Sequence, residues 1–325
     1  MIKLKTLHGL IGLMLLTLSC QLNGQSGNDY NREVANKVGK AFAERYVFPE
    51  TGLKIKELLE DKASNGAYDD FQDLSALGES IKEDIFSIAN DKHVVVSYLE
   101  PKEGADEPEQ GQRMQEFFNS LKNYGLDNSK VLDGNIGYME IEIFYPLRMD
   151  AKAGDFAEKI MQKFKDTEAI IFDLRKCKGG DPSMLNLIIS YLYPPGEKVH
   201  LNTFYYRPND FSFDTYTLDE VDGPTYPEKP VYVLTSNTTF SCGEEFAYDI
   251  QQLERGTMVG ETTGGGAHTV EPYLIDENFE INLPTGRAIN PISKSNWEGT
   301  GVKPDIEVTA DEALEKAISI IKNNN

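Results

Sequence analysis

A single serine ends an apolar run in the segment TSNTTFSCGEEFAYDI, residues 235–250, where a helical pattern begins. A serine hydroxyl in this position could act as a nucleophile if a base takes its proton and backbone N–H groups stabilise the oxyanion that forms. The spacing of Ser241 and Glu244 is also that of a capping box, in which each side chain accepts a hydrogen bond from a backbone N–H of the other residue. The segment alone therefore predicts a helix cap as readily as a nucleophile.

Four histidines are candidate bases for such a nucleophile. His8 lies in an apolar N-terminal segment, and His200 lies in the alternating stretch EKVHLNTFYY, which predicts a strand with a structural histidine. His93 comes directly before three valines, and His268 follows a glycine-rich stretch. The residues alone favour a structural role for either of the last two histidines, and they leave the choice of base open.

The elements that must position these residues alternate between strands and helices over residues 134–256. The strand patterns GNIGYMEIEIF, EAIIFDLR and PVYVLTSN each lead to a helical pattern, in AGDFAEKIMQKFKD, KGGDPSMLNLIISYL and GEEFAYDIQQLERG respectively. The KGGD turn and the turn that holds Ser241 then follow the carboxyl ends of two strands, where open α/β sheets bind ligands. We therefore predict an α/β fold with the functional residues at these turns.

The chain divides into four predicted parts. Residues 1–24 place lysines before an apolar stretch that is too short to span a bilayer, which is typical of a signal peptide. Residues 25–100 show helical periodicity up to about residue 90 and predict a small all-helical N-terminal domain. Residues 101–130 begin with the acidic stretch PKEGADEPEQGQ and are predicted to form an exposed connector, and residues 131–325 form the core domain.

The N-terminal segment predicts an exported protein, in the periplasm, in the cell envelope or outside the cell. Cys20 follows TLS and is a candidate lipidation site that would attach the chain to a membrane, and ordinary cleavage nearer LNGQS is the alternative. Removal of residues 1–20 changes the formal net charge from −21 to about −23, because Lys3 and Lys5 leave and no acidic residue does. Such acidity argues against a nucleic-acid partner, and it carries no information about the oligomeric state.

Six sequence blocks together resemble the signature blocks of the C-terminal processing (tail-specific) serine peptidase family. They occur in the order of that family over residues 91–308, as NDKHVVVSY, GNIGYMEIEIF, IIFDLRKCKGG, TSNTTFSCGEEFA, VGETTGGGA and NWEGTGVKPDIEV. The helical start at residues 31–90 is similar to the N-terminal unit of members akin to interphotoreceptor retinoid-binding protein. The resemblance implies a crotonase/ClpP-like core and a serine peptidase that hydrolyses a peptide or protein substrate through an acyl-enzyme, without a metal or an organic cofactor.

The resemblance also implies roles for individual residues. Ser241 falls on the position of the nucleophile, His93 on that of the general base, and Glu298 on that of the acid that orients the base in the tricorn-core-like branch. Another branch of the family uses a lysine just after the T-x-G turn, and the corresponding stretch TTGGGAH contains no lysine. We therefore expect a Ser-His-Glu site rather than a Ser-Lys site.

The oxyanion hole implied by the resemblance is formed by backbone N–H groups of Gly179, Gly180 and Cys242. Cys177 stands where the family block usually has asparagine, and Cys242 directly follows the nucleophile. Because both thiols flank this oxyanion hole, we expect them to be neighbours that could form a disulfide bond on oxidation. Neither cysteine has the spacing of a metal site.

Two further hypotheses concern ligands. Arg287 in LPTGRAINP could bind a substrate carboxylate, although an arginine in a loop more often forms a surface ion pair. The alternative function is that of a non-catalytic binding protein for an apolar ligand or a peptide, because the retinoid-binding relatives use this scaffold without proteolysis. The interval between Tyr98 and Gly134 is too short for an inserted peptide-binding domain of about 80 residues.

Overall fold

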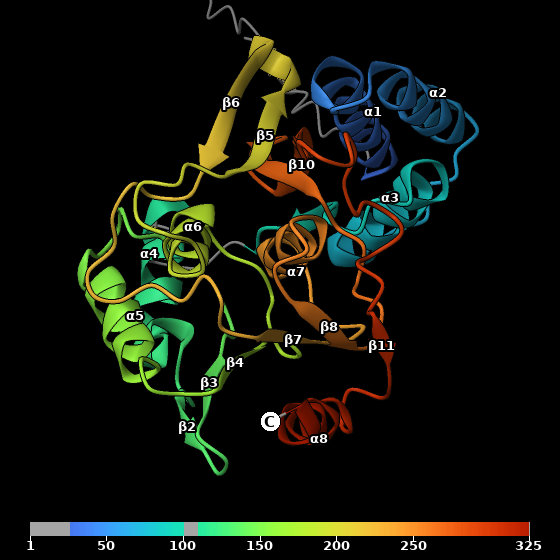
Figure 1. The fold of residues 1–325 in the computed structure, drawn as a ribbon. Coiled ribbons are helices and arrows are strands. Elements are labelled where there is room, and N and C mark those ends of the chain that lie inside the picture. The colour runs from blue at the N-terminus through green and yellow to red at the C-terminus, as the bar shows by residue number, and fades with distance from the viewer. Residues whose placement is uncertain (1–26, 101–109, 325) are drawn as a thin grey trace, which may run out of the picture.

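Two β-sheets position the functional residues, and helices cover both of them (Figure 1). The computed structural model describes residues 27–100 and 110–324. The helices are α1 (Gly27–Arg45), α2 (Pro49–Ser64), α3 (Leu74–Ala89), α4 (Gln110–Ser120), α5 (Lys152–Lys163), α6 (Pro182–Ser190), α7 (Cys242–Gln252) and α8 (Ala313–Asn324), with short 3-10 turns η1 (Lys122–Gly125) and η2 (Arg207–Asn209). None of the described helices is long and apolar enough to cross a membrane.

The larger sheet is almost entirely parallel. Its strand order is β11-β8-β7-β4-β3-β2, and only the edge pair β2/β3 is antiparallel. The strands are β2 (Lys130–Leu132), β3 (Ile136–Glu140), β4 (Ala169–Asp173), β7 (Val231–Thr235), β8 (Thr257–Gly260) and β11 (Ile306–Glu307). Alternate side chains of β4 pack on opposite faces: Phe172 lies in the core beneath α5, α6 and α7, and Ile171 lies in the core beneath α8.

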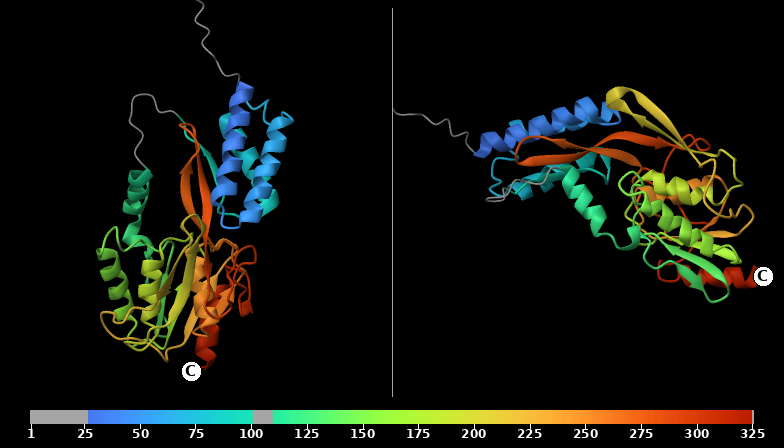
Figure 2. Two further views of the ribbon diagram at one scale, coloured as in Figure 1. Left: turned by 90° about the horizontal axis from the view of Figure 1, so that it is seen from above. Right: turned by 90° about the vertical axis from the view of Figure 1, so that its left-hand side faces the viewer.

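The second sheet is antiparallel and links the N-terminal helices to the core. It runs β1-β10-β5-β6, with β9 also paired to β10. Its strands are β1 (Val95–Tyr98), β5 (His200–Tyr206), β6 (Phe211–Tyr216), β9 (His268–Leu274) and β10 (Phe279–Ile289). The first half of β10 packs against α1–α3 through Phe279, Ile281 and Leu283, and its second half pairs with β5 near the main core (Figure 2).

The predicted α/β class with an N-terminal helical region is confirmed. Helices α1–α3 do not form a separate core, however, because they bury their apolar faces against β1 and β10. The predicted domain boundary at residue 100 therefore does not separate two hydrophobic cores. His93 lies between α3 and β1, at the place where the helical region joins the sheet.

The predicted connector, residues 101–130, is in part wrong. Residues 110–120 form α4, whose Phe118 packs edge-on against Tyr145 at a ring-centroid distance of 5.3 Å. The acidic, glycine- and proline-rich stretch ends at residue 112, and the part of the helix that follows carries the apolar residues Met114, Phe117 and Phe118, of which only Phe118 is buried. Residues 101–109 lie outside the described residues, as do residues 1–26 with the predicted signal peptide and Cys20.

Candidate active site

The turn between β7 and α7 presents Ser241 at the N-terminus of a helix. Its backbone has φ 56° and ψ −125°, in a region that an L-residue seldom adopts. A serine in a strained turn between a strand and a helix is the arrangement of a nucleophile elbow, in which the hydroxyl is held clear of both elements. The N–H groups of the first turn of α7, which include that of Cys242, have no partner within the helix.

Backbone strain at Ser241 has a measurable consequence. Such a conformation costs about 1–3 kcal/mol, and glycine adopts it without strain but loses about 0.5–1 kcal/mol more conformational entropy on folding. We therefore expect Ser241→Gly to be more stable than Ser241→Ala by about 1 kcal/mol, since both variants lack the hydroxyl. Urea unfolding of the two variants measures this difference, and equal midpoints would contradict the strained turn.

Glu244 holds this turn against the glycine-rich loop at residues 264–266. One carboxylate oxygen, Oε2, accepts the N–H of Ser241 at 3.0 Å and the N–H of Gly266 at 2.8 Å. The other oxygen, Oε1, accepts the N–H of Gly265 at 2.6 Å and the hydroxyl of Thr263 at 2.5 Å. Glu244 thus performs its half of the predicted capping box and also ties together two loops of the site.

Gly179 and Gly180 bring the KGG turn against Ser241. Both have positive φ, 116° and 126°, and a Cβ added to Gly179 would lie 2.8 Å from the Cβ of Ser241. A Cβ added to Gly180 would lie 2.1 Å from the carbonyl oxygen of Phe144, which pairs with this turn. Only glycine fits at both positions, so the backbone itself faces Ser241.

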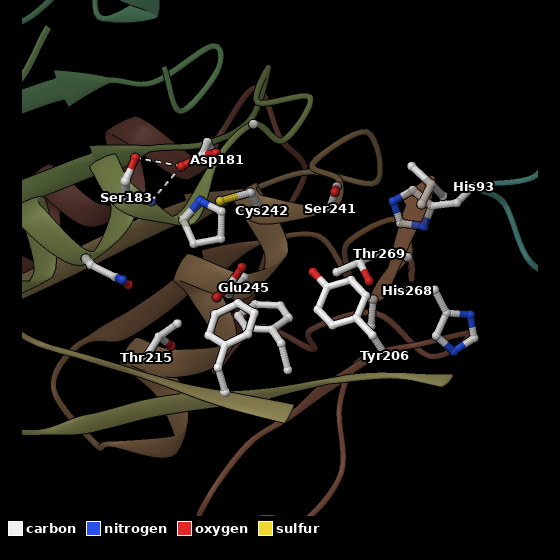
Figure 3. A pocket seen from close by; sticks show the side chains of 18 of the residues that line it. His93, Asp181, Ser183, Tyr206, Thr215, Ser241, Cys242, Glu245, His268 and Thr269 are labelled. Carbon is white, nitrogen blue, oxygen red and sulfur yellow. Dashed lines mark hydrogen bonds between the residues drawn. The ribbon is translucent and has the colours of Figure 1, made fainter. Parts of the chain in front are cut away.

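His93 lies on the other side of Ser241, and both residues line one cavity (Figure 3). Its ring packs on Phe240 at a centroid distance of 4.6 Å, and its Cε1 would lie 2.7 Å from a Cβ added to Gly266. Both ring nitrogens are buried and have no hydrogen-bond partner among the described residues. In this state, therefore, no hydrogen bond joins His93 to the serine.

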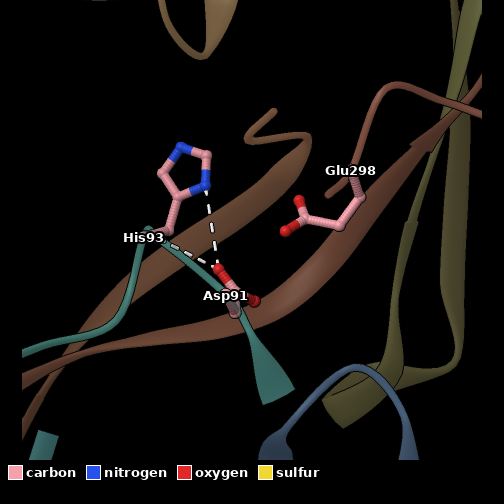
Figure 4. Close-up of side chains that lie close together, drawn as sticks. All are labelled: Asp91, His93 and Glu298. Atoms are coloured by element: carbon pink, nitrogen blue, oxygen red, sulfur yellow. Dashed lines mark hydrogen bonds and ion pairs between the residues drawn. The ribbon is translucent and has the colours of Figure 1, made fainter. Parts of the chain in front are cut away.

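Asp91 and Glu298 lie close to the side chain of His93 (Figure 4). Oδ1 of Asp91 accepts the backbone N–H of His93 at 3.0 Å and lies 4.0 Å from Nδ1 of the ring. Oε2 of Glu298 accepts the N–H groups of Ala267 and His268, whereas its Oε1 is buried and has no partner among the described residues. One ligand atom from each of the three side chains lies within 4.8 Å of the others, so the same group has the composition of a metal site.

His268 belongs to a second layer of this network. Its Nδ1 lies 2.6 Å from Oδ2 of Asp91, which also accepts the hydroxyl of Tyr46 at 3.1 Å. The imidazole packs edge-on against Tyr46 and Phe48 and is 5% exposed. Asp91 thus lies between the two histidines that the sequence left as alternatives, with one carboxylate oxygen toward each.

Burial sets the protonation of these groups. It lowers the pKa of His93 to about 4, against the opposing charge of Asp91, so the imidazole is neutral at pH 7. Burial and the neighbouring Asp91 raise the pKa of Glu298. Burial would also raise the pKa of Asp91, but hydrogen bonds from His268 and from the N–H of His93 outweigh it and hold that pKa below its usual value.

Cys177 and Cys242 are free and buried. Sγ of Cys177 would lie 2.8 Å from a Cβ added to Gly243, the residue after Cys242, so the expectation that the cysteines are neighbours is met without a disulfide bond. Burial raises the pKa of the Cys177 thiol to about 12 and that of Cys242 well above its ordinary value. Both side chains are therefore uncharged thiols at neutral pH.

Arg287 is not among the residues that line the cavity beside Ser241. It lies near the C-terminal end of β10 rather than in a loop, and its guanidinium lies over the rings of Phe48 at 5.1 Å and Tyr205 at 5.7 Å. His200 is half-buried on β5, as predicted, and interacts with Thr203 and Asp214. Lys92, next to His93 in the sequence, donates to the carbonyl of Gly264 at 2.6 Å.

Sequence reasoning missed two acidic residues at this site. Asp91 stands two residues before His93, and the Asp-x-His spacing was the available signal, because an aspartate side chain readily accepts the N–H two residues on. Glu245 lines the cavity from the first turn of α7. No local pattern distinguishes it from a solvent-exposed helix residue next to Glu244.

Comparison with known proteins identifies the family. Residues 135–308 match peptidase family S41, and residues 30–124 match the N-terminal domain of peptidase S41 in eukaryotic IRBP. The first match alone spans more than half of the chain, so the protein belongs to peptidase family S41. Tricorn protease of Thermoplasma volcanium is 27% identical over 164 residues, which are 47% of this chain and 14% of that protein. The chain therefore corresponds to a small part of that relative.

Solved structures extend the likeness over most of the chain. A candidate peptidase of Parabacteroides merdae superposes with a TM-score of 0.65 at 18% identity, covering 90% of this chain and 96% of that one. A lipoprotein of Streptococcus agalactiae superposes with a TM-score of 0.62 at 14% identity, covering 91% and 97%. At such identities these likenesses establish the fold alone.

Proposed function

We propose that this protein is a serine peptidase that cleaves peptide bonds through an acyl-enzyme on Ser241. The observation that carries the proposal is the convergence of Ser241, His93 and the KGG turn on one cavity, within a chain of peptidase family S41. A neutral His93 takes the hydroxyl proton as Ser241 attacks the substrate carbonyl, and returns it to the leaving amine. Water then hydrolyses the acyl-enzyme by the same route.

Glu298 is the acid that orients the base in this proposal. Both oxygens of Asp91 are already occupied, by the N–H of His93 on one side and by His268 and Tyr46 on the other. The buried Oε1 of Glu298 has no hydrogen-bond partner among the described residues, and one carboxylate oxygen of Glu298 belongs to the group of ligand atoms within 4.8 Å of one another that includes His93. It accepts Nδ1–H once the ring turns Nε2 toward Ser241, and catalytic hydrogen bonds often tighten only when substrate is bound. Asp91 fixes the backbone of His93 and stabilises the imidazolium by its charge.

The oxyanion of the tetrahedral intermediate faces backbone N–H groups in this proposal. The N-terminus of α7 supplies the N–H of Cys242, and the turn at Gly179 and Gly180 supplies the donor from the opposite side. Both groups are held by rigid backbone contacts rather than by mobile side chains. The proposed site needs no metal ion, because the base, the nucleophile and the oxyanion donors are all groups of the chain.

We also propose export of the protein, with lipid attachment at Cys20 as one form of it. The support is the apolar N-terminal segment and the structural likeness to a lipoprotein of Streptococcus agalactiae. Mass spectrometry of the protein from its native cell envelope tests both statements. An N-terminus that retains residues 1–19 would contradict them.

The pH dependence of peptide hydrolysis tests the proposed function. We expect the protein to cleave an unfolded, fluorescently quenched protein substrate, and kcat/KM to fall as the pH drops toward the pKa of about 4 of His93, because the protonated imidazole no longer accepts the serine proton. A fluorophosphonate that modifies serine should abolish the cleavage. No cleavage at any pH, together with displacement of an apolar fluorescent ligand, would instead favour a binding protein on this scaffold.

A further inference from the structure

Glu245 is an acidic side chain buried in the wall of the candidate active site. It lies one turn into α7, is 3% exposed, and lines a cavity of about 630 Å³ together with Ser241 (Figure 3). Glutamate is almost never fully buried unless it is paired. Unlike its neighbour Glu244, it takes no part in holding the turn of the nucleophile.

No cationic side chain neutralises Glu245 among the described residues. Its Oε1 accepts a hydrogen bond from Nδ2 of Asn202 at 3.2 Å, and the same nitrogen donates to both oxygens of Asp249 one turn further along α7. Burial raises the pKa of Glu245 to about 8, and Asp181 near the rim adds to the shift. Arg148, an arginine that lines the cavity, is already paired with Asp181.

The cavity wall also contains a buried acceptor that has no donor among the described residues. Oδ1 of Asn186 on α6 is buried and has no hydrogen-bond partner among the described residues, and this side chain lines the same cavity. The β5–β6 hairpin adds the rings of Phe204, Tyr206 and Phe213 to the wall. The cavity therefore offers hydrogen-bond acceptors and aromatic faces, which suit a long aliphatic side chain that ends in a cation.

The position of Glu245 relative to Ser241 indicates which part of a substrate it meets. In Figure 3, Ser241 lies between His93 and Cys242, and Glu245 lies on the side of Cys242. The leaving amine must face the base that protonates it, so the acyl part of the substrate occupies the side away from His93. Glu245 is thus on the acyl side of the cleaved bond.

We propose that Glu245 and Asn186 form a subsite for a lysine or arginine side chain at the residue whose carbonyl is attacked. This inference rests on the proposed peptidase function and names its substrate class. The bound cation takes the place of a proton on Glu245, and the aromatic wall covers the aliphatic stem of the substrate side chain. An uncharged apolar side chain would leave the buried carboxyl with its hydrogen bond from Asn202 and without a cationic partner.

Two matched covalent probes test this subsite. They are peptidyl diphenyl phosphonates that differ only in a lysine-like or a norleucine-like side chain next to phosphorus, and both react with a serine nucleophile and release phenol. At pH 8.5 we expect the wild-type protein to react with the lysine probe at least about tenfold faster. In Glu245→Gln the ratio should fall to about one, and in the control Glu315→Gln, on the exposed side of α8, it should stay as in the wild type.

The pH dependence of that ratio adds a second readout. The groups that face Glu245 are Asp249 and Cys242 of α7, Asp181 before α6 and Tyr206 of β5. Burial and the carboxyls among these groups disfavour the ionisation of Glu245 near neutral pH. The ionised fraction of Glu245, and with it the preference for the lysine probe, should therefore grow as the pH rises from 6 to 9. A ratio that is the same at both ends of this range would contradict the role of Glu245.

A competition experiment covers the case that Glu245→Gln does not fold. Butylguanidinium should protect the wild-type protein from a small fluorophosphonate, and its uncharged analogue butylurea should not. Equal reaction with both phosphonates, or equal protection by both competitors, would overturn the cationic subsite while leaving the peptidase proposal intact. If none of the probes labelled the protein, both the proposed peptidase function and the cationic subsite would be contradicted.

Discussion

His93→Ala is expected to lower the rate of peptide cleavage by about 10³-fold or more, and Ser241→Ala by a similar factor. The two losses are alike because the nucleophile and its base act as one unit, so that removal of either leaves only binding and the oxyanion hole. The buried ring nitrogens of His93 are the structural basis of this expectation, because neither forms a hydrogen bond with any residue that the structure describes. Initial rates with a quenched peptide substrate measure both losses.

His268→Gln is the matched comparison for the choice of base. Its Nδ1 is engaged by Asp91 at 2.6 Å, and its ring is enclosed by Tyr46 and Phe48, so we expect a loss of less than about tenfold. Added imidazole should partly restore activity to His93→Ala and not to Ser241→Ala. A greater loss in His268→Gln than in His93→Ala would transfer the role of base to His268.

Glu244→Gln is expected to destabilise the protein by about 3–5 kcal/mol and to lower the rate of reaction with a fluorophosphonate as well. All four partners of this buried carboxylate are donors: Ser241, Gly265, Gly266 and Thr263. A glutamine side chain would turn its NH₂ group toward two of them and leave those N–H groups without an acceptor. The nucleophile turn and the glycine-rich loop would then lose their common support.

Urea unfolding measures this cost, and Glu315→Gln serves as the control because it removes an exposed carboxylate on α8. We expect the control to change the free energy of unfolding by no more than about 0.5 kcal/mol. A Glu244→Gln variant as stable as the control would mean that the four hydrogen bonds contribute little. If Glu244→Gln were destabilised but still reacted with the fluorophosphonate at the wild-type rate, Glu244 would stabilise the fold without positioning Ser241. That result would contradict a positioning role for Glu244.

Local patterns were enough to predict three adjacent strands of the larger sheet, β3, β4 and β7. The strands β3, β4 and β7 are short apolar runs that end in turns, and each leads to a helix as the sequence indicates. The antiparallel sheet was harder to predict because its pairs join distant segments. Strand β10 pairs with β1, about 190 residues earlier in the chain, and no local signal specifies such a partner.

Local sequence patterns predict the candidate site only in part, as they do the sheets. The Ser241 turn and the glycines at 179 and 180 could be located from motifs, since positive φ and close approach leave few residue types. The choice between His93 and His268 could not be made from the residues, because it depends on the carboxylate of Asp91 that lies between them. Whether a buried acid such as Glu245 faces a cavity is a property of the packing and not of the helix that carries it.

The central claim is that Ser241 is the nucleophile and His93 its base. A crystal structure of the protein after reaction with a fluorophosphonate tests it most directly. In that structure we expect phosphorus to be bonded to Oγ of Ser241, with the phosphoryl oxygen within hydrogen-bond distance of the N–H groups of Cys242 and the KGG turn. We expect the nearest base to be a nitrogen of His93. An adduct on another residue, or an unreacted Ser241 in a folded protein, would contradict it.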